Sequence, residues 1–240
     1  MTDDPSWMLP LSQDLERTCQ RAHAIAAERR ARAGAEDFLL ALTDDPAAVP
    51  ILEACMVDRD ALQAALRAAG ARAMRGVVPS IGFLPILHRA SANRHASGHN
   101  DAVNGAHALA AILAGTSPAL TDTLRRHGLT RFDALRFIAH GLRKGEEPGD
   151  DAKATSAPTL AVKLLNDDYT PMEFVVTTLE RLFEHDRESA ARVMLWVHNN
   201  GVAVCGTYPA EIAREKRAAA VALARAAEFP LCCVLAAASS

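Results

Sequence analysis

Apolar residues recur with a helical period through the first 140 or so residues, and the pattern is repeated once. In the first copy, Phe38–Leu42 is followed by Asp45-Pro46, and in the second copy Leu109–Leu113 is followed by Ser117-Pro118. Each copy predicts a long helix, a short apolar helix, a proline-marked turn and two more short helices. An offset of about 70 residues is too long for a solenoid repeat. We therefore expect one all-α domain with pseudo-twofold symmetry.

Residues with strong local preferences mark the ends of several of these helices. Asp58 and Thr130 each precede the last helix of a copy, where a short oxygen-bearing side chain is a good N-cap. The segment from Gly70 to Pro79 contains Gly76 and is expected to join the two copies.

The helical pattern stops between Leu142 and Pro158, where charged residues, glycine and proline replace the apolar positions. This composition predicts a solvated, flexible linker. We expect a helical domain over residues 1–141, a linker over 142–158 and a second domain over 159–240. A coil of about 17 residues spans roughly 20–25 Å, so the two domains are free to touch or to separate.

The second domain has a mixed pattern that predicts strands and helices in the order β-α-α-β-α-β. The expected strands are Leu160–Leu165, Val202–Gly206 and Leu231–Leu235. The expected helices run from Pro171 to about Phe183, from a cap at Asp186 to the stop at Asn199-Asn200-Gly201, and from Pro209 to about Glu228. We expect an α+β domain in which three helices pack on a three-stranded antiparallel sheet.

Composition and charge exclude several classes of function. Half of the residues are apolar, which allows a sizeable core, and the net charge of -3 gives no basic excess for nucleic acid or an anionic membrane. No apolar run reaches the roughly 18–20 residues that span a bilayer. The acidic start Met1–Pro5 does not resemble a signal peptide, so we expect a cytoplasmic protein.

No sequence motif for catalysis or for cofactor binding is found. The chain has no GxxxxGK[ST] phosphate loop, no GxSxG elbow and no HExxH zinc helix. His95 and His99, with His88 nearby, have a spacing that a metal site uses, but no cysteine or carboxylate completes a ligand set. We favour surface histidines, and expect no enzyme activity, no metal and no cofactor.

The five cysteines do not predict disulfides or redox chemistry. They are odd in number, scattered and without CxxC spacing. The adjacent Cys232 and Cys233 point to opposite faces of a strand. We interpret all five as reduced and mostly buried small apolar residues.

The stretch from Leu164 to Phe174 carries the most specific chemistry of the chain. An apolar strand leads into Asn166-Asp167-Asp168, and Pro171 then opens a helix. His198 ends the next helix, which must pack near the same strand. An amide, a carboxylate and an imidazole are suited to replacing the water around a buried α-ammonium.

An apolar depression is expected beside these polar groups, with Met172 at its rim. Its predicted lining is Val175, Met194, Val197 and Leu231. A peptide that begins with a bulky apolar residue has both the cation and the apolar group for such a site. The alternative is structural, since Asn-Asp-Asp before proline is also a common turn and cap signal, and Met and Val at helical spacing usually form a core.

Residues from Val162 to Leu235 resemble the ClpS family, the adaptors that hand N-degron proteins to a Clp unfoldase–protease. The likeness rests on the run Asn166–Val175, on Met194-Leu195 and Val197-His198, on Cys205-Gly206, and on Pro230-Leu231. It covers essentially the whole second domain.

The resemblance implies a role for each matching residue. Asn166, Asp167 and His198 would bind the α-amino group of a substrate, and Met172 would gate a pocket that rejects β-branched N-terminal residues. The pocket would be lined by Thr170, Val175, Met194 and Leu231, and Glu211 and Lys216 would contact the unfoldase N-domain. Thr178 is a departure, because many members carry an aliphatic residue there.

The first domain resembles the N-terminal domain of the ClpA unfoldase, through Leu15–Leu42, Leu52–Cys55 and Ile138–Gly141. The 240 residues contain no ATPase module. The two resemblances imply a fusion that binds N-degron substrates and modulates their delivery to ClpA with ClpP. The alternative is a self-docked regulator or decoy that sequesters substrates or inhibits degradation. Docking of the two domains, within one chain or between two, is compatible with both.

Overall fold

The chain forms two compact units, Met1–Ala134 and Leu135–Ser240, in the computed structural model. The structure describes residues 9–73, 82–96, 101–116, 118–151 and 158–238. Gly76, Pro79, His99 and Ser117 lie outside the described residues. None of the described helices is long and apolar enough to cross a bilayer.

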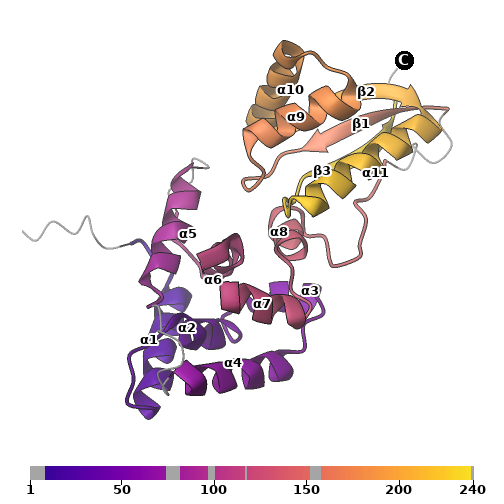
Figure 1. Cartoon of the computed structure of the whole chain (residues 1–240). Coiled ribbons are helices and arrows are strands. Elements are labelled where there is room, and N and C mark those ends of the chain that lie inside the picture. The colour runs from indigo at the N-terminus through magenta and orange to yellow at the C-terminus, as the bar shows by residue number, and fades with distance from the viewer. Residues whose placement is uncertain (1–8, 74–81, 97–100, 117, 152–157, 239–240) are drawn as a thin grey trace, which may run out of the picture. The chain divides into compact units, whose positions relative to one another are not determined.

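The first unit is all-helical and contains two successive sets of helices, as the doubled pattern predicts (Figure 1). The first set is α1 (Gln13–Glu28), α2 (Ala35–Leu42), α3 (Val49–Ala54) and α4 (Arg59–Ala73). The second set is α5 (Leu84–Ala96), α6 (Gly105–Ala111) with its continuation η2 (Ile112–Thr116), α7 (Pro118–Arg126) and α8 (Arg131–His140). Helix α8 crosses the boundary between the two units.

Side chains from both sets meet in the core of this unit. The fully buried Phe38 stacks on Phe83, with 4.7 Å between ring centroids. Asp45 is also fully buried and accepts a hydrogen bond from the Thr18 hydroxyl at 2.6 Å. A Cβ at Gly105 would collide with the Asp45 carboxylate, so this position of the second set requires glycine.

The predicted caps are confirmed. Asp58 accepts from the amide of Ala61 at 3.0 Å, and Thr130 accepts from the amide of Asp133 at 3.1 Å. Each bond satisfies one of the free N–H groups that begin a helix.

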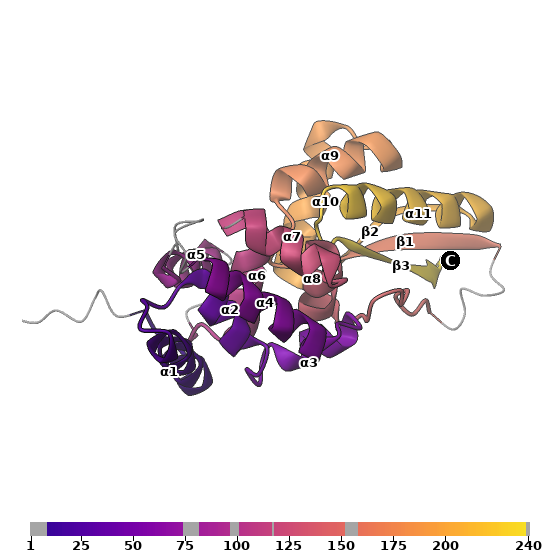
Figure 2. The same ribbon diagram turned by 60° about the horizontal axis from the view of Figure 1, so that its bottom comes forward.

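The second unit has the predicted order of strands and helices. Its elements are β1 (Thr159–Leu165), α9 (Met172–Phe183), α10 (Arg187–Asn200), β2 (Val202–Pro209), α11 (Ala210–Ala226) and β3 (Cys232–Ala237). Both strand pairs are antiparallel and the sheet order is β2-β1-β3. Helix α11 packs on all three strands, and α9 and α10 pack on each other and on β2 (Figure 2).

Local signals set the helix ends in this unit. Asp186 caps α10 by accepting from the amide of Ser189 at 2.7 Å. Gly201 ends α10 in the left-handed region at φ 82°, which glycine adopts without strain. Pro171 and Pro209 occupy the N-cap positions of α9 and α11, one residue before the helices begin.

Two strands, β2 and β3, end at other residues than expected, because pairing with β1, rather than local sequence, decides where a strand ends. β2 continues to Pro209, since β1 begins at Thr159 and the two residues pair. β3 begins at Cys232 and reaches Ala237, which pairs with Leu160. Helix α11 stops at Ala226, two residues before the expected Glu228.

The segment expected as a free linker is in part attached to the second unit. Asp150 accepts two bonds from the Arg217 guanidinium, at 2.7 and 2.8 Å, and one from the Leu235 amide at 2.9 Å. The Asp151 amide donates to the Leu235 carbonyl at 2.9 Å. These two residues bond to α11 and to the outer edge of β3, and the flexible linker over residues 142–158 stays a prediction. Residues 152–157 lie outside the described part of the chain.

All five cysteines are free, and four of them are buried, as expected. Burial raises the pKa of the Cys205 thiol to about 12 and that of the Cys232 thiol to about 11. These thiols are protonated at neutral pH and behave as small apolar side chains.

Candidate functional site

Asp167 organises the loop between β1 and α9. Its Oδ1 accepts from the amides of Tyr169 at 2.8 Å and Thr170 at 2.6 Å, and its Oδ2 accepts from the Thr170 hydroxyl at 2.8 Å. The turn interpretation of Asn-Asp-Asp is thus confirmed. A carboxylate has about four acceptor positions, so three bonds leave Asp167 able to accept one more from a ligand.

The end of β1 is joined to the end of α10. The Asn166 amide donates to the Gly201 carbonyl at 2.8 Å, and Gly201 is the C-cap of the helix whose last turn carries His198. Among the residues that the structure describes, the side chains of Asn166 and His198 form no hydrogen bond. The polar groups predicted to bind an α-ammonium therefore lie on segments that are bonded to each other.

The residues predicted to line a pocket range from fully buried to half exposed. Leu231 and Val197 are buried, at 2 % and 4 % exposed, whereas Met172 is 48 % exposed. Between these extremes are three half-buried residues, Thr170, Val175 and Met194. Met172 is the first residue of α9, and its position at the rim of a pocket stays a prediction.

Two aromatic rings join α9 to the corner before β3. Phe174 packs edge-to-face on Phe229, with 5.0 Å between ring centroids. Pro230 and Leu231 follow Phe229 directly, so this contact connects the helix of Met172 and Val175 with the segment of Leu231. Such aromatic pairs contribute about 0.5–1.5 kcal/mol beyond their buried area.

Thr178 is 4 % exposed and donates its hydroxyl to the Phe174 carbonyl at 2.8 Å. The polar group at this departure from the resemblance is satisfied within α9. It therefore adds no unpaired polar atom to the apolar surroundings.

Glu211 and Lys216, predicted to contact an unfoldase domain, both lie on α11. Glu211 is exposed in the first turn of this helix. The Lys216 ammonium donates to the Leu182 carbonyl at 2.6 Å and to Glu184 at 3.0 Å, and it lies 4.8 Å from the centre of the Tyr208 ring. Lys216 thus stabilises the end of α9.

Sequence reasoning did not identify one contact within the second unit, between His140 at the end of α8 and the corner before β3. The His140 Nε2 lies 3.2 Å from the carbonyl oxygen of Pro230. Burial lowers the pKa of His140, and the charge of Asp167 acts against this by raising it. Only a long-range contact, which the sequence does not reveal, relates His140 to these residues.

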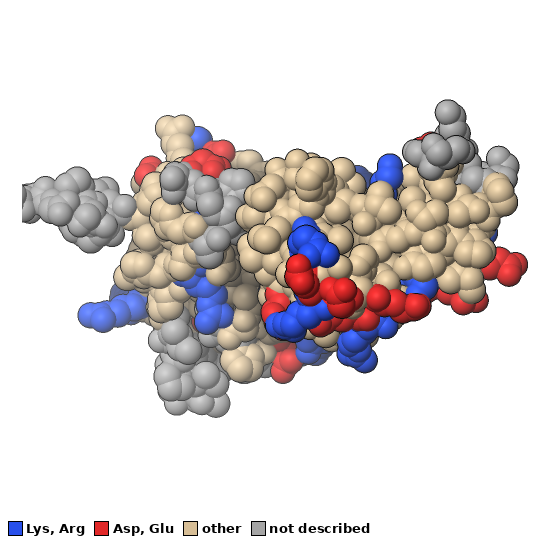
Figure 3. All heavy atoms as spheres, turned by 90° about the horizontal axis from the view of Figure 1, so that it is seen from above, with Lys and Arg blue, Asp and Glu red and all other residues tan. Residues whose placement is uncertain are grey.

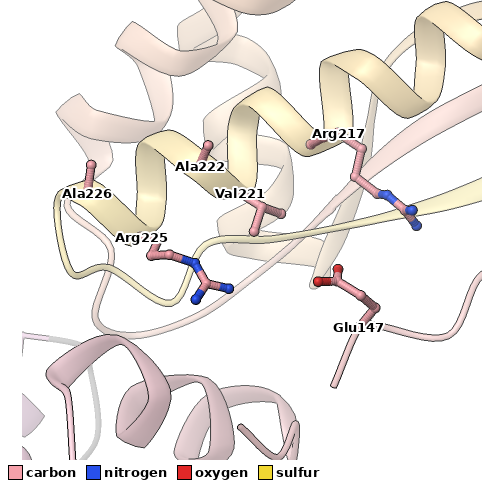
Figure 4. A pocket seen from close by; sticks show the side chains of 7 residues that line it. Glu147, Arg217, Val221, Ala222, Arg225 and Ala226 are labelled. Carbon is pink, nitrogen blue, oxygen red and sulfur yellow. The ribbon is translucent and has the colours of Figure 1, made fainter. Parts of the chain in front are cut away.

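One cavity of the second unit lies away from the predicted site. It has a volume of about 490 Å³ and lies between Glu147 and α11, where Arg217 and Arg225 flank a floor that includes Val221 (Figure 4). Its lining contains none of the residues predicted for peptide binding. Since Arg217 is held by Asp150, the cavity follows from the way the linker attaches to α11.

Charged side chains of α9 and α10 form pairs. Arg187 lies 3.0 Å from Glu173, and Arg192 lies 2.6 Å from Glu188. One view of the surface shows acidic and basic residues side by side, next to a wide uncharged area (Figure 3). Among the described residues in this view, basic side chains lie beside acidic ones, unlike the continuous basic surface of a protein that binds nucleic acid.

Two protein families match separate parts of the chain. Residues 155–234 match the ATP-dependent Clp protease adaptor protein ClpS, and residues 10–127 match the Clp repeat N-terminal domain. The two matches agree with the fusion that the sequence resemblances indicate. The first family consists of adaptors rather than enzymes, which fits the expectation that the chain is not an enzyme.

Curated proteins similar to this chain include ClpS adapters that match about a third of it. The protein from Hyphomonas neptunium is 56 % identical over 82 residues, which are 34 % of this chain and 70 % of that protein. The protein from Caulobacter vibrioides strain NA1000 is 54 % identical over 34 % of this chain and 75 % of its own length. The protein from Aromatoleum aromaticum is 45 % identical over 36 % of this chain and 84 % of its own length.

Among solved structures, the chain is similar to Agrobacterium tumefaciens ClpS2 bound to L-phenylalaninamide. The identity is 38 %, the match covers 32 % of this chain and 94 % of that chain, and the TM-score is 0.32.

Proposed function

Because this chain belongs to the ClpS family of Clp protease adaptors, we propose that it binds proteins with bulky hydrophobic N-terminal residues. We further propose that it modulates their delivery to a ClpA-type unfoldase with ClpP in the cytoplasm. In this role Asn166, Asp167 and His198 bind the α-amino group. The first side chain of the substrate enters a depression lined by Thr170, Val175, Met194 and Leu231, with Met172 at the rim.

The observation that supports this proposal most is the hydrogen-bonding capacity that Asn166, Asp167 and His198 keep for a ligand. Asp167 keeps an open acceptor position although it holds its own loop, and the Asn166 and His198 side chains form no hydrogen bond among the described residues. The half-buried Asn166 and Asp167 and the exposed His198, together with an apolar lining that includes buried Leu231, suit a ligand that is cationic and apolar at adjacent atoms.

The free energies of the hydrogen bonds and of the apolar burial agree with reversible binding. Hydrogen bonds to a charged group contribute about 1.5–3 kcal/mol each. Burial of a Leu or Phe side chain contributes roughly 1.5–3 kcal/mol. After the loss of rigid-body freedom on association, a dissociation constant on the order of micromolar, or about -8 kcal/mol, is expected. An adaptor that must release its substrate does not need tighter binding.

The Clp N-terminal domain in the same chain supports a second candidate. It resembles the domain on which an adaptor docks, and a short tether raises its effective concentration to roughly millimolar. If it occupies the surface around Glu211 and Lys216, the chain sequesters substrates and inhibits degradation. The two candidates share the peptide site and differ in the sign of their effect.

Degradation of an N-degron reporter by ClpA and ClpP, with this chain added, distinguishes the two candidates. We expect faster degradation if the chain delivers substrates, and slower degradation if it is a decoy. The control is the Asp167→Ala chain, which should lose either effect because it no longer binds the reporter. A rate unchanged by the wild-type chain at concentrations well above micromolar would contradict both candidates.

A further inference from the structure

The corner between α11 and β3 carries one wall of the predicted pocket and has little regular structure. Helix α11 ends at Ala226, Glu228 adopts a left-handed conformation with φ 57°, and β3 starts only at Cys232. Leu231 is the pocket residue of this corner. Its position therefore depends on the contacts that hold the residues before it.

One of these contacts comes from a residue outside the two matched ranges, residues 10–127 and 155–234. His140 ends α8, and it lies between these two ranges. Its Nε2 lies 3.2 Å from the oxygen of Pro230, a buried residue next to Leu231. A carbonyl oxygen can only accept, so Nε2 carries the hydrogen and His140 donates.

We propose that His140 is a positioning residue of the peptide site, which holds the Pro230–Leu231 corner and thereby one wall of the pocket. This inference rests on the proposed function. It means that the adaptor unit of this chain includes residues that precede the part shared with other adaptors.

The residues that follow His140, up to Asp151, help to keep it in place. Asp150 is bonded to Arg217 and to the Leu235 amide, and the Asp151 amide is bonded to the Leu235 carbonyl. The segment from His140 to Asp151 is thus attached at both ends, to the residue before Leu231 and to β3. Fixed ends reduce the number of conformations the segment can adopt and favour a defined position of the imidazole.

His140 interacts electrostatically with Asp167 of the predicted α-amino site. The groups that act on it are the Asp167 carboxylate, which favours its protonated form, and the Arg136 guanidinium, which opposes it. Burial is the largest influence and lowers the pKa of His140, so the ring is neutral at neutral pH. At acidic pH a protonated His140 would compete with a substrate ammonium for the negative potential of Asp167.

Both the folding stability and the peptide affinity should decrease as the pH falls. Because its pKa in the folded chain is lowered, neutral His140 contributes stability above its unfolded pKa, and this contribution is lost as pH falls below it. Peptide affinity should also fall on acidification, as His140 in the folded chain takes up its proton below the ordinary histidine range. Only the part of the change in affinity that disappears when His140 is replaced belongs to this residue.

The test uses the full chain and a peptide with a free N-terminal Phe, followed by fluorescence anisotropy. For His140→Ala we expect about fivefold weaker binding at pH 7.5, the factor that corresponds to one neutral hydrogen bond. His140→Gln keeps an N–H donor. It should bind within about twofold of the wild type at pH 7.5 and show a smaller loss of affinity on acidification.

His185→Ala is the matched control. His185 Nε2 lies 2.6 Å from the Cys205 carbonyl, and His185 follows the end of α9 opposite to Met172. This variant loses the same type of bond and should keep its affinity. Equal affinity of His140→Ala and the wild type, or equal losses in the two alanine variants, would overturn the inference. Absence of peptide binding by the wild type would instead overturn the proposed function, and the inference with it.

Discussion

Replacing Asp167 by alanine is expected to abolish binding of peptides that begin with Leu or Phe. The substitution removes the negative charge predicted to face the α-ammonium. It also removes the acceptor for the amides of Tyr169 and Thr170, so the loop that carries the site loses its shape. The measurement is the dissociation constant of the full chain for a Phe-initiated peptide, by anisotropy or calorimetry.

Asp167→Asn separates these two contributions. The amide oxygen still accepts from the two loop amides, whereas the charge is gone. We expect roughly 10–100-fold weaker binding, which corresponds to the loss of a charge-assisted hydrogen bond. Asp168→Asn is the control, because it removes one negative charge from the neighbouring exposed position and should change affinity by about twofold or less. Equal effects at the two positions would show that general electrostatics, rather than a specific contact, attracts the peptide.

Replacing Met172 by alanine is expected to admit peptides that begin with Ile or Val. Met172 is 48 % exposed at the start of α9, where its side chain is predicted to form the rim of the pocket. Removal of this side chain gives room for a second branch at Cβ. We expect at least about tenfold tighter binding of Ile and Val peptides, since burial of such side chains contributes roughly 1.5–3 kcal/mol.

The matched control is Ile212→Ala, which removes an apolar side chain of similar exposure, 40 %, from α11. Its preference for Leu and Phe over Ile and Val should equal that of the wild type. If Met172→Ala also keeps the wild-type preference, Met172 is not the gate.

Local chemistry accounts for the part of the fold that was predictable from sequence. Asp58, Thr130 and Asp186 cap helices because their oxygen atoms reach amides three residues away, and Gly201 ends α10 because it adopts a positive φ. These effects operate within a few residues and can be identified in a single sequence.

The attachment of the linker was not predictable in this way. Glycine, proline and charged residues around Glu147 favour a coil, and nothing in the segment itself identifies the partners of Asp150. These are Arg217, 67 residues away, and the Leu235 amide, 85 residues away. His140 is a similar case, since it contacts Pro230 across 90 residues. Contacts of this length depend on the assembled sheet.

For the candidate site, the sequence indicated the residue types and the two segments that carry them. It left open whether Asp167 holds its own turn or serves a ligand. The structure confirms the turn, and ligand binding stays a prediction. The two roles are compatible because a carboxylate has more acceptor positions than the turn uses.

Capture of a protonated peptide terminus is the central claim, and N-terminal acetylation tests it most directly. The affinity of the full chain is measured by calorimetry for a Phe-initiated peptide with a free α-amino group and for its acetylated form. We predict a dissociation constant on the order of micromolar for the free peptide, and binding of the acetylated peptide no better than that of a scrambled control. Equal affinity for the free and acetylated peptides would contradict the claim.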